Sequence, residues 1–207
     1  MTDSWRTSRE GPVARFFLDT GERPPTLSPE ILGELAGRID REAAAGASVA
    51  VIASAAAGVF AAGADLRVVR ELTPAVGYLY ARTGQEALFR IARAACATIA
   101  EIDGACYGGA LDLAMACDIR FASSRAAFCH PGPRLGIVTG WGGTVFAPRR
   151  IGVARARRLF RSGEVFDAPA AYSMGLVDEL ASSEDLSGRT ASAARQISQG
   201  NWNQLFR

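Results

Sequence analysis

The stretch GACYGGALDLAMACD, residues 104–118, places three glycines and the carboxylate of Asp112 where a strand passes into a helix. The residues ATIAEIDG (97–104) have the apolar pattern of a buried strand, and GALDLAMACD has that of a helix. Glycine lets another group approach the main chain closely, and the first N–H groups of a helix have no partner within it. The stretch therefore predicts a strand-to-helix turn with free main-chain donors.

Strands and helices alternate on both sides of this stretch. The unbroken apolar run SVAVIASA (48–55) is typical of a strand buried on both faces of a parallel sheet. Ser28 and Pro29 open an amphipathic helix. A longer helix is predicted over about 75–94, with an apolar face of Val76, Leu79, Leu88 and Ile91. Further strands are predicted at residues 13–19, 119–124, 126–130 and 175–180, and the alternation predicts an α/β fold.

Size and composition are those of one globular domain, residues 1–207. The chain is 49% hydrophobic and 21% charged, with a net charge of +2. All 23 cationic side chains are arginine, because the sequence contains no lysine. Lysine-based catalysis and a P-loop, which needs a GK[ST] motif, are therefore excluded. The segment GACYGGA also fails the dinucleotide-binding pattern G-x-G-x-x-G.

Six arginines crowd into RRIGVARARRLFR, residues 149–161. Without interleaved stacking aromatics, the pattern favours an amphipathic helix with a solvated arginine face over a nucleic-acid site. We therefore expect no nucleic-acid partner. Its apolar residues are Ile151, Val153, Leu159 and Phe160.

Four cysteines, at positions 96, 106, 117 and 129, are ten to twelve residues apart. This spacing contains no CxxC pair, so we expect neither a metal site nor a redox site. Buried thiols favour a reducing compartment, and the sequence has no apolar leader and no run of transmembrane length. These features predict a cytoplasmic protein that does not enter a membrane.

A second small-residue loop, FAAGADL (60–66), also follows a buried strand, as CYGGALDL (106–113) does. Two such loops can bring main-chain N–H donors together as an oxyanion hole. Asp112 lies three residues after Gly109 and so on the same helix face, where an acid or base would stand beside a polarised carbonyl. The alternative is that Asp112 is only a polar residue on a helix surface.

Four segments in order, FAAGADL, EIDGACYGGALDLAMACDIRFASSRAAF, RLGIVTGWGGT and AAYSMGLVDEL, resemble the enoyl-CoA hydratase/isomerase family, or crotonase superfamily. The resemblance covers residues 13–180. It implies a spiral of repeated ββα units, an acyl-coenzyme A thioester as substrate, no prosthetic group, and a homotrimer or hexamer. It also implies that residues 181–207 form a shortened helical tail, so that either the site is open or a larger homologous subunit covers it.

The resemblance assigns roles to particular residues. The N–H groups of Ala64 and Gly109 would hold the thioester oxygen, and Asp112 would be the acid or base. Ala62, Ala64 and Arg67 would bind coenzyme A. Gly132 stands where hydratases of the family have a second Glu, which favours a one-base proton shift or a weakened hydration.

The remaining candidates have alternatives. His130, the single histidine, is expected to be a packing residue, or else to replace the missing acid. Tyr107 and Trp141 either line the acyl pocket or fill the core. Asp65 is expected to cap a helix, and Asp118 to tie a helix end to the next strand.

Three functions therefore stay open. The first is an enoyl-CoA hydratase or isomerase. The second is a non-catalytic helper subunit, and the third is an acyl-CoA decarboxylase or C–C lyase. Thr139 stands where the naphthoyl-CoA synthase branch has an aspartate, so that branch's reaction is not carried over.

Overall fold

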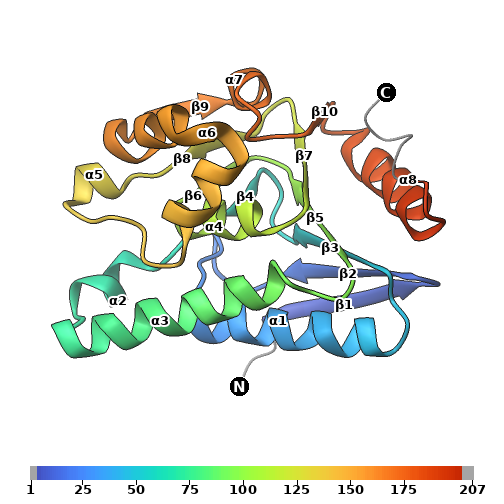
Figure 1. Cartoon of the computed structure of the whole chain (residues 1–207), viewed down its shortest axis with the longest axis horizontal. Coiled ribbons are helices and arrows are strands. Elements are labelled where there is room, and N and C mark those ends of the chain that lie inside the picture. Colours follow the sequence, from blue (N-terminus) through green and yellow to red (C-terminus); the bar gives the residue numbers. More distant parts are fainter. Residues whose placement is uncertain (1–3, 202–207) are drawn as a thin grey trace.

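The computed structural model describes residues 4–201, whose strands form two sheets (Figure 1). The larger sheet has the order β1 (Trp5–Glu10), β2 (Val13–Leu18), β3 (Val49–Ser54), β5 (Ala97–Ile102), β7 (Ile119–Ser123) and β10 (Glu179–Ala181). The smaller sheet has the order β4 (Val59–Ala61), β6 (Ala105–Tyr107), β8 (Ala127–Cys129) and β9 (Val165–Asp167). All neighbouring strands are parallel except the pairs β1–β2 and β8–β9.

From β3 to β8, successive strands alternate between the two sheets, with a helix closing each turn. β3 is followed by β4 and α3, β5 by β6 and α4, and β7 by β8 and α6. This ββα repetition is the spiral that the sequence resemblance implies. The helices are α1 (Pro29–Ala44), α2 (Leu66–Arg70), α3 (Pro74–Ile91), α4 (Gly109–Ala116), α5 (Gly132–Leu135), α6 (Gly143–Ser162), α7 (Ala168–Ser173) and α8 (Leu186–Ser198).

The central strands of the larger sheet, β3, β5 and β7, are buried on both faces, as the run 48–55 predicts for its own strand. Along β3, Ala50 and Ile52 face the main core, whereas Val49 and Val51 face a second cluster with α8. Figure 1 shows α8 well apart from α1 and α3, which pack side by side. The packed core thus includes α8 and Trp5, outside the 13–180 span of the resemblance.

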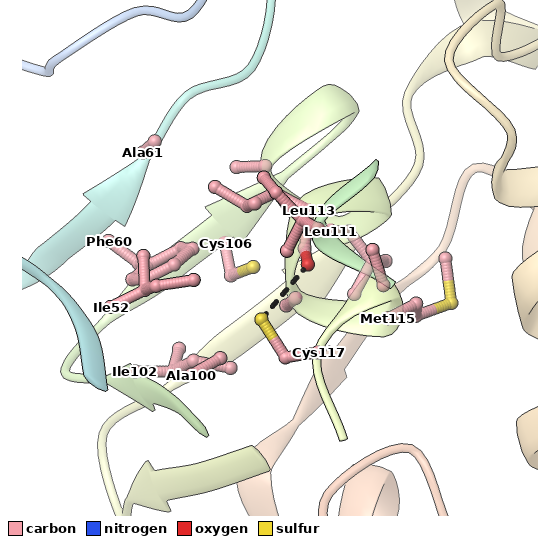
Figure 2. Close-up of a cluster of buried hydrophobic side chains, with 14 of the residues drawn as sticks. Ile52, Phe60, Ala61, Ala100, Ile102, Cys106, Leu111, Leu113, Met115 and Cys117 are labelled. Atoms are coloured by element: carbon pink, nitrogen blue, oxygen red, sulfur yellow. Dashed lines mark hydrogen bonds between the residues drawn. The ribbon is translucent and has the colours of Figure 1, made fainter. Parts of the chain in front are cut away.

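The main core surrounds α4. Figure 2 shows Leu111, Leu113 and Cys117 gathered against side chains of the strands, including Ile52 and Ile102. Seven of the eight α4 residues are buried, including Asp112, so this helix has no polar face. The alternative that Asp112 lies on a helix surface is therefore wrong.

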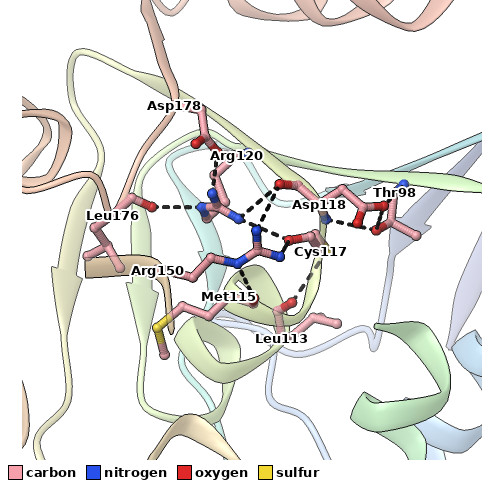
Figure 3. Close-up of polar contacts among 9 residues, drawn as sticks. All are labelled: Thr98, Leu113, Met115, Cys117, Asp118, Arg120, Arg150, Leu176 and Asp178. Carbon is pink, nitrogen blue, oxygen red and sulfur yellow. Dashed lines mark hydrogen bonds and ion pairs between the residues drawn. The ribbon is translucent and has the colours of Figure 1, made fainter. Parts of the chain in front are cut away.

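Hydrogen bonds fix the end of α4 (Figure 3). The N–H of Thr98 donates to Asp118 Oδ2 at 2.8 Å, so Asp118 ties the helix end to the preceding strand β5 and not to the following one. Arg120 is buried, donates to the carbonyls of Leu176 and Cys117, and pairs with Asp178. These contacts tie the C-terminal end of α4 to β5 and to the segment that leads into β10.

Two helices differ from the sequence expectation. Thr73 caps α3, but Val76 and Leu79 are 50% and 60% exposed, because only the C-terminal half of α3 packs on the core. In α6, Val153 is also exposed, since the non-helical Gly152 changes the helix direction. Arg150 is exposed, as the predicted solvated face requires, and it also donates to the carbonyl of Cys117 at 2.6 Å.

Candidate active site

The two small-residue loops meet at the edge of the smaller sheet. They follow β4 and β6, which are parallel neighbours, so both loops leave the sheet at the same end. Gly63 has φ +87°, and a Cβ there would lie 2.8 Å from the N of Gly109 and 2.6 Å from the carbonyl oxygen of Tyr107. The contact between the loops therefore requires glycine at position 63.

The neighbouring N–H groups of these loops are bonded inside the protein. The N–H of Ala62 donates to Pro25, that of Leu27 to Gly63, and that of Gly108 to Cys129, all at 2.8–2.9 Å. Within residues 4–201, no hydrogen bond is found for the N–H of Ala64 or of Gly109, the first residue of α4. Both residues line the same cavity. Unpartnered main-chain N–H groups on one cavity wall are the kind of donors from which an oxyanion hole is built.

Trp141 packs directly on the second loop. A Cβ at Gly109 would collide with the indole ring, and so would one at Gly84 of α3. The ring is 4% exposed and lies 5.6 Å from the ring of Tyr80. Burial raises the pKa of Tyr80 to about 12, and the carboxylates of Glu30 and Asp65 add to that effect, so the phenol is neutral near pH 7.

Asp112 points into the cavity from the first turn of α4. Its Oδ2 accepts a hydrogen bond from the hydroxyl of Thr139, and its Oδ1 lies 3.5 Å from Nε2 of His130. A Cβ at Gly143, the first residue of α6, would collide with Oδ1, so the carboxylate sits against the N-terminus of that helix. The helix dipole there favours negative charge.

The space beside Gly132 is taken by main chain. A Cβ at Gly132 would collide with the carbonyl oxygen of Ile137 and would lie 3.5 Å from Nδ1 of His130. A glutamate at this position therefore needs a different path for the loop after α5. His130 is the ionisable side chain closest to the place where a second acid would begin.

A cavity of about 270 Å³ joins these groups. Among the predicted site residues, it is lined by Ala62, Ala64, Gly109, Asp112, His130, Gly132 and Trp141. Its apolar walls come from α2, the segment between α2 and α3, α5 and the loop before α6, with the side chains Leu66, Val69, Leu72, Leu135, Ile137 and Val138. A site with mostly apolar walls and a few converging polar groups suits an acyl chain with a polar head.

Two predicted residues lie outside this lining. Tyr107 is on β6, where the buried neighbour Cys106 faces the core and Tyr107 faces the other way. Arg67 pairs with Asp65 at 2.8 Å and with Glu22 at 3.6 Å, and its side chain is 79% exposed. Asp65 caps α2 by accepting from the N–H of Arg67, as expected. The side-chain hydrogen bond from the Arg67 guanidinium, followed by this N–H contact, lowers the pKa of Asp65.

Sequence reasoning gave no role to Thr139 or Tyr80. Thr139 belongs to RLGIVTG, a segment that the motifs single out, but a hydroxyl contact to Asp112 depends on how that loop folds back over α4. Tyr80 is half-buried against the main core, in helical register with the buried Leu88 and Ile91. The helical period therefore includes it, although the apolar face predicted for this helix does not. A larger hollow along α3, lined by Arg82, Arg90 and Arg93 among others, lies away from Asp112.

The family profile and the curated relatives that match this chain belong to the same family. The profile of the enoyl-CoA hydratase/isomerase family matches residues 9–205. The probable enoyl-CoA hydratase echA8 of Mycobacterium tuberculosis is 32% identical over 197 residues, covering 92% of this chain and 74% of that protein. The enoyl-CoA isomerase/hydratase fer4 of Mycosarcoma maydis is 39% identical over 123 residues, covering 59% of this chain. That match covers 45% of fer4, so the chain spans about half the length of several curated relatives.

Solved structures have the same architecture. An enoyl-CoA hydratase/carnithine racemase from Magnetospirillum magneticum superposes with a TM-score of 0.89 at 26% identity, covering 100% of this chain and 80% of the other. An enoyl-CoA hydratase from Thermoplasma volcanium gives 0.87 at 29% identity, covering 95% and 77%. These likenesses confirm the fold class that the sequence predicts.

Proposed function

The chain belongs to the enoyl-CoA hydratase/isomerase family, and from this premise we propose that it acts on an acyl-coenzyme A thioester. The N–H groups of Ala64 and Gly109 stabilise the thioester oxygen as an enolate forms. Asp112 moves the proton at the neighbouring carbons. No prosthetic group takes part, and coenzyme A enters as part of the substrate, with Ala62 beside it.

The observation that carries this proposal is the convergence of two unpartnered N–H groups and one buried carboxylate in one apolar cavity. Each preorganised donor is worth about 3 kcal/mol when charge develops on an oxygen in a dry site. Enolate formation then needs a base at the α- or γ-carbon of the acyl chain. Asp112, one turn along α4 from Gly109, supplies it.

The proposed reactions are hydration of a 2-enoyl thioester and isomerisation of a 3-enoyl or dienoyl thioester. Each passes through a thioester enolate, a β-hydroxy enolate in hydration and a dienolate in isomerisation, and both carry the negative charge on the thioester oxygen. Isomerisation needs one base that removes a proton at one carbon and returns it at another, which suits a site with Gly132 in place of a second acid. Hydration needs in addition a group that positions water.

The test is a panel of thioesters assayed with the wild-type chain and with Asp112→Asn. We expect turnover of crotonyl-CoA, a 3-enoyl-CoA or a dienoyl-CoA by the wild type, with kcat lowered by about a hundredfold or more in the variant, because asparagine cannot accept the proton. Asp65→Asn, which alters a carboxylate at the start of α2, is the matched control and should keep its activity. Equal rates for Asp112→Asn and wild type would sink the proposal.

The absent second acid favours one further reaction. Loss of a carboxyl group from a malonyl-type thioester also forms a thioester enolate and needs fewer proton carriers, so turnover of malonyl-CoA in the panel would indicate a decarboxylase. No turnover of any thioester, together with copurification of a larger homologue, would indicate a helper subunit.

The oligomeric state and the cellular location of the protein stay predictions. We expect a homotrimer or a hexamer, and light scattering of the purified chain measures its mass. The four cysteines are buried and unpaired, which supports a reducing compartment such as the cytoplasm. Among residues 4–201, no helix combines the length and hydrophobicity of a membrane span.

A further inference from the structure

Two buried polar atoms face each other in the cavity without hydrogen-bond partners. Within the described part of the chain, these are Oδ1 of Asp112 and Nε2 of His130, and they lie 3.5 Å apart. Both residues line the cavity, and they are 0% and 5% exposed. Buried polar atoms in native proteins normally have partners, so two orphans side by side in a cavity indicate a small polar ligand or a shared proton.

We propose that His130 is a second catalytic residue, and that it forms with Asp112 a proton-sharing pair in place of two carboxylates. This inference rests on the proposed function, since it assigns the second proton carrier of the same site. A carboxylate beside an imidazolium holds one proton between two groups, just as an ionised acid beside a protonated one does. His130 thus supplies the second proton carrier that a glycine at position 132 cannot provide.

The proton balance of a hydration can be followed step by step. The pair starts as ionised Asp112 and protonated His130, with water on the two orphan atoms. The water oxygen bonds to the β-carbon while one O–H bond breaks and its proton moves to Asp112. The π electrons move onto the thioester oxygen.

The second half of the reaction restores the pair. His130 gives its proton to the α-carbon, a C–H bond forms there, and the enolate electrons return to the thioester carbonyl. Asp112 then passes its proton to His130 across the 3.5 Å contact. Water has been added across the double bond, and no oxidant or other reactant is needed.

The surroundings of the imidazole favour this pairing. Among residues 4–201, Asp112 of α4 is the carboxylate that comes within 4 Å of the ring. The α6 contact is the ring of Phe160, edge-on at 5.1 Å, and the neighbour on β8 is the neutral thiol of Cys129. The α5 cation nearest in sequence, Arg134, packs on Gly163. Asp112 is therefore the charged group that faces the imidazole of His130.

The kinetic test compares wild type with His130→Gln, which keeps polarity but cannot carry a charge. We expect kcat for hydration to fall by about a hundredfold or more. His130→Gln should lower kcat much more than it changes KM, because the imidazole carries a proton and does not hold the thioester. Phe160→Leu is the matched control, because it loosens the packing of the ring but leaves the imidazole, so kcat should stay within about threefold of wild type.

A packing role for His130 predicts the opposite outcome. If His130→Gln turns over within about threefold of wild type while Asp112→Asn is inactive, the inference fails and the proposed function stands. If wild type turns over no thioester, the proposed function fails. A second measurement then tests whether Asp112 and His130 interact as a pair.

That measurement is ¹⁵N NMR of the imidazole, which is unambiguous because the chain has one histidine. The Nε2 resonance should respond to the charge of the neighbouring Asp112 carboxylate, so it should shift in Asp112→Asn but not in Asp65→Asn. The resonance does not depend on the substrate or on the stability of a His130 variant. Identical spectra for Asp112→Asn and wild type would overturn the inference.

Discussion

At the scale of single residues, the site is defined by what surrounds one carboxylate. Asp112 is fully buried, and its two oxygens have different neighbours: Thr139 at Oδ2, and His130 with the α6 N-terminus at Oδ1. A buried carboxylate needs such partners, because an isolated charge in the interior is costly. The hydroxyl fixes one oxygen and leaves the other facing the cavity.

Thr139→Val tests that arrangement with a nearly isosteric change. Removing the hydroxyl donor leaves Oδ2 without its partner, and a hydrogen bond to a charged group is worth about 1.5–3 kcal/mol. We expect kcat/KM on the best thioester to fall about tenfold to a hundredfold, with the fold retained by circular dichroism. Thr144→Val, in the first turn of α6, is the control. A rate equal to wild type would show that Thr139 does not orient the base.

At the scale of elements, the site depends on two loops that leave neighbouring short strands. Periodicity predicts the long strands well, because β3 and β5 each have six residues and face two apolar layers. It does not predict β4, β6 or β9, since three residues are too few to show a period. The glycines mark the loops, but the pairing of β4 with β6 is a long-range contact that local patterns do not contain.

The sequence therefore predicts the individual residues of the site better than it predicts how the fold brings them together. Ala64, Gly109 and Asp112 belong to short motifs that can be recognised locally. His130 is near Asp112 only because β8 pairs with β6, and the filling of the space at Gly132 by Ile137 follows from a tertiary turn. Arg67 fits the motif, but its guanidinium forms an ion pair with Asp65, two residues away, and does not line the cavity.

Gly63→Ala tests the loop contact. The left-handed φ costs about 1 kcal/mol for alanine, and the Cβ additionally pushes the loop off the N of Gly109. Gly21→Ala is a matched control, because its φ is +72° with nothing within 4 Å of the added carbon. We expect Gly21→Ala to lose about 1 kcal/mol of unfolding free energy and keep its activity, and Gly63→Ala to lose more stability and most of its turnover. Equal effects of the two changes would disprove a steric role.

At the scale of the whole molecule, two packed layers enclose all four thiols. Cys106 and Cys117 lie in the centre of the main core, and Cys96 and Cys129 near its edges, 6% and 4% exposed. Burial raises the pKa of every one of them, that of Cys117 to about 12 and that of Cys106 well above its usual range. A protonated, enclosed thiol is a poor nucleophile.

The folded chain should therefore resist thiol reagents and lose stability in alkali. At pH 8 we expect no rapid reaction with Ellman's reagent, and four thiols to react in guanidinium chloride. The unfolded chain releases thiol protons from about pH 8.5, whereas the folded chain holds that of Cys117 to about 12, so the unfolding free energy falls as pH rises, by up to about 1.4 kcal/mol per pH unit per thiol. Denaturant titrations at pH 7.5 and 9.5 measure this loss. Cys117→Ala removes one contribution and should flatten the dependence, and an equal slope in the variant would contradict the assignment to that buried thiol.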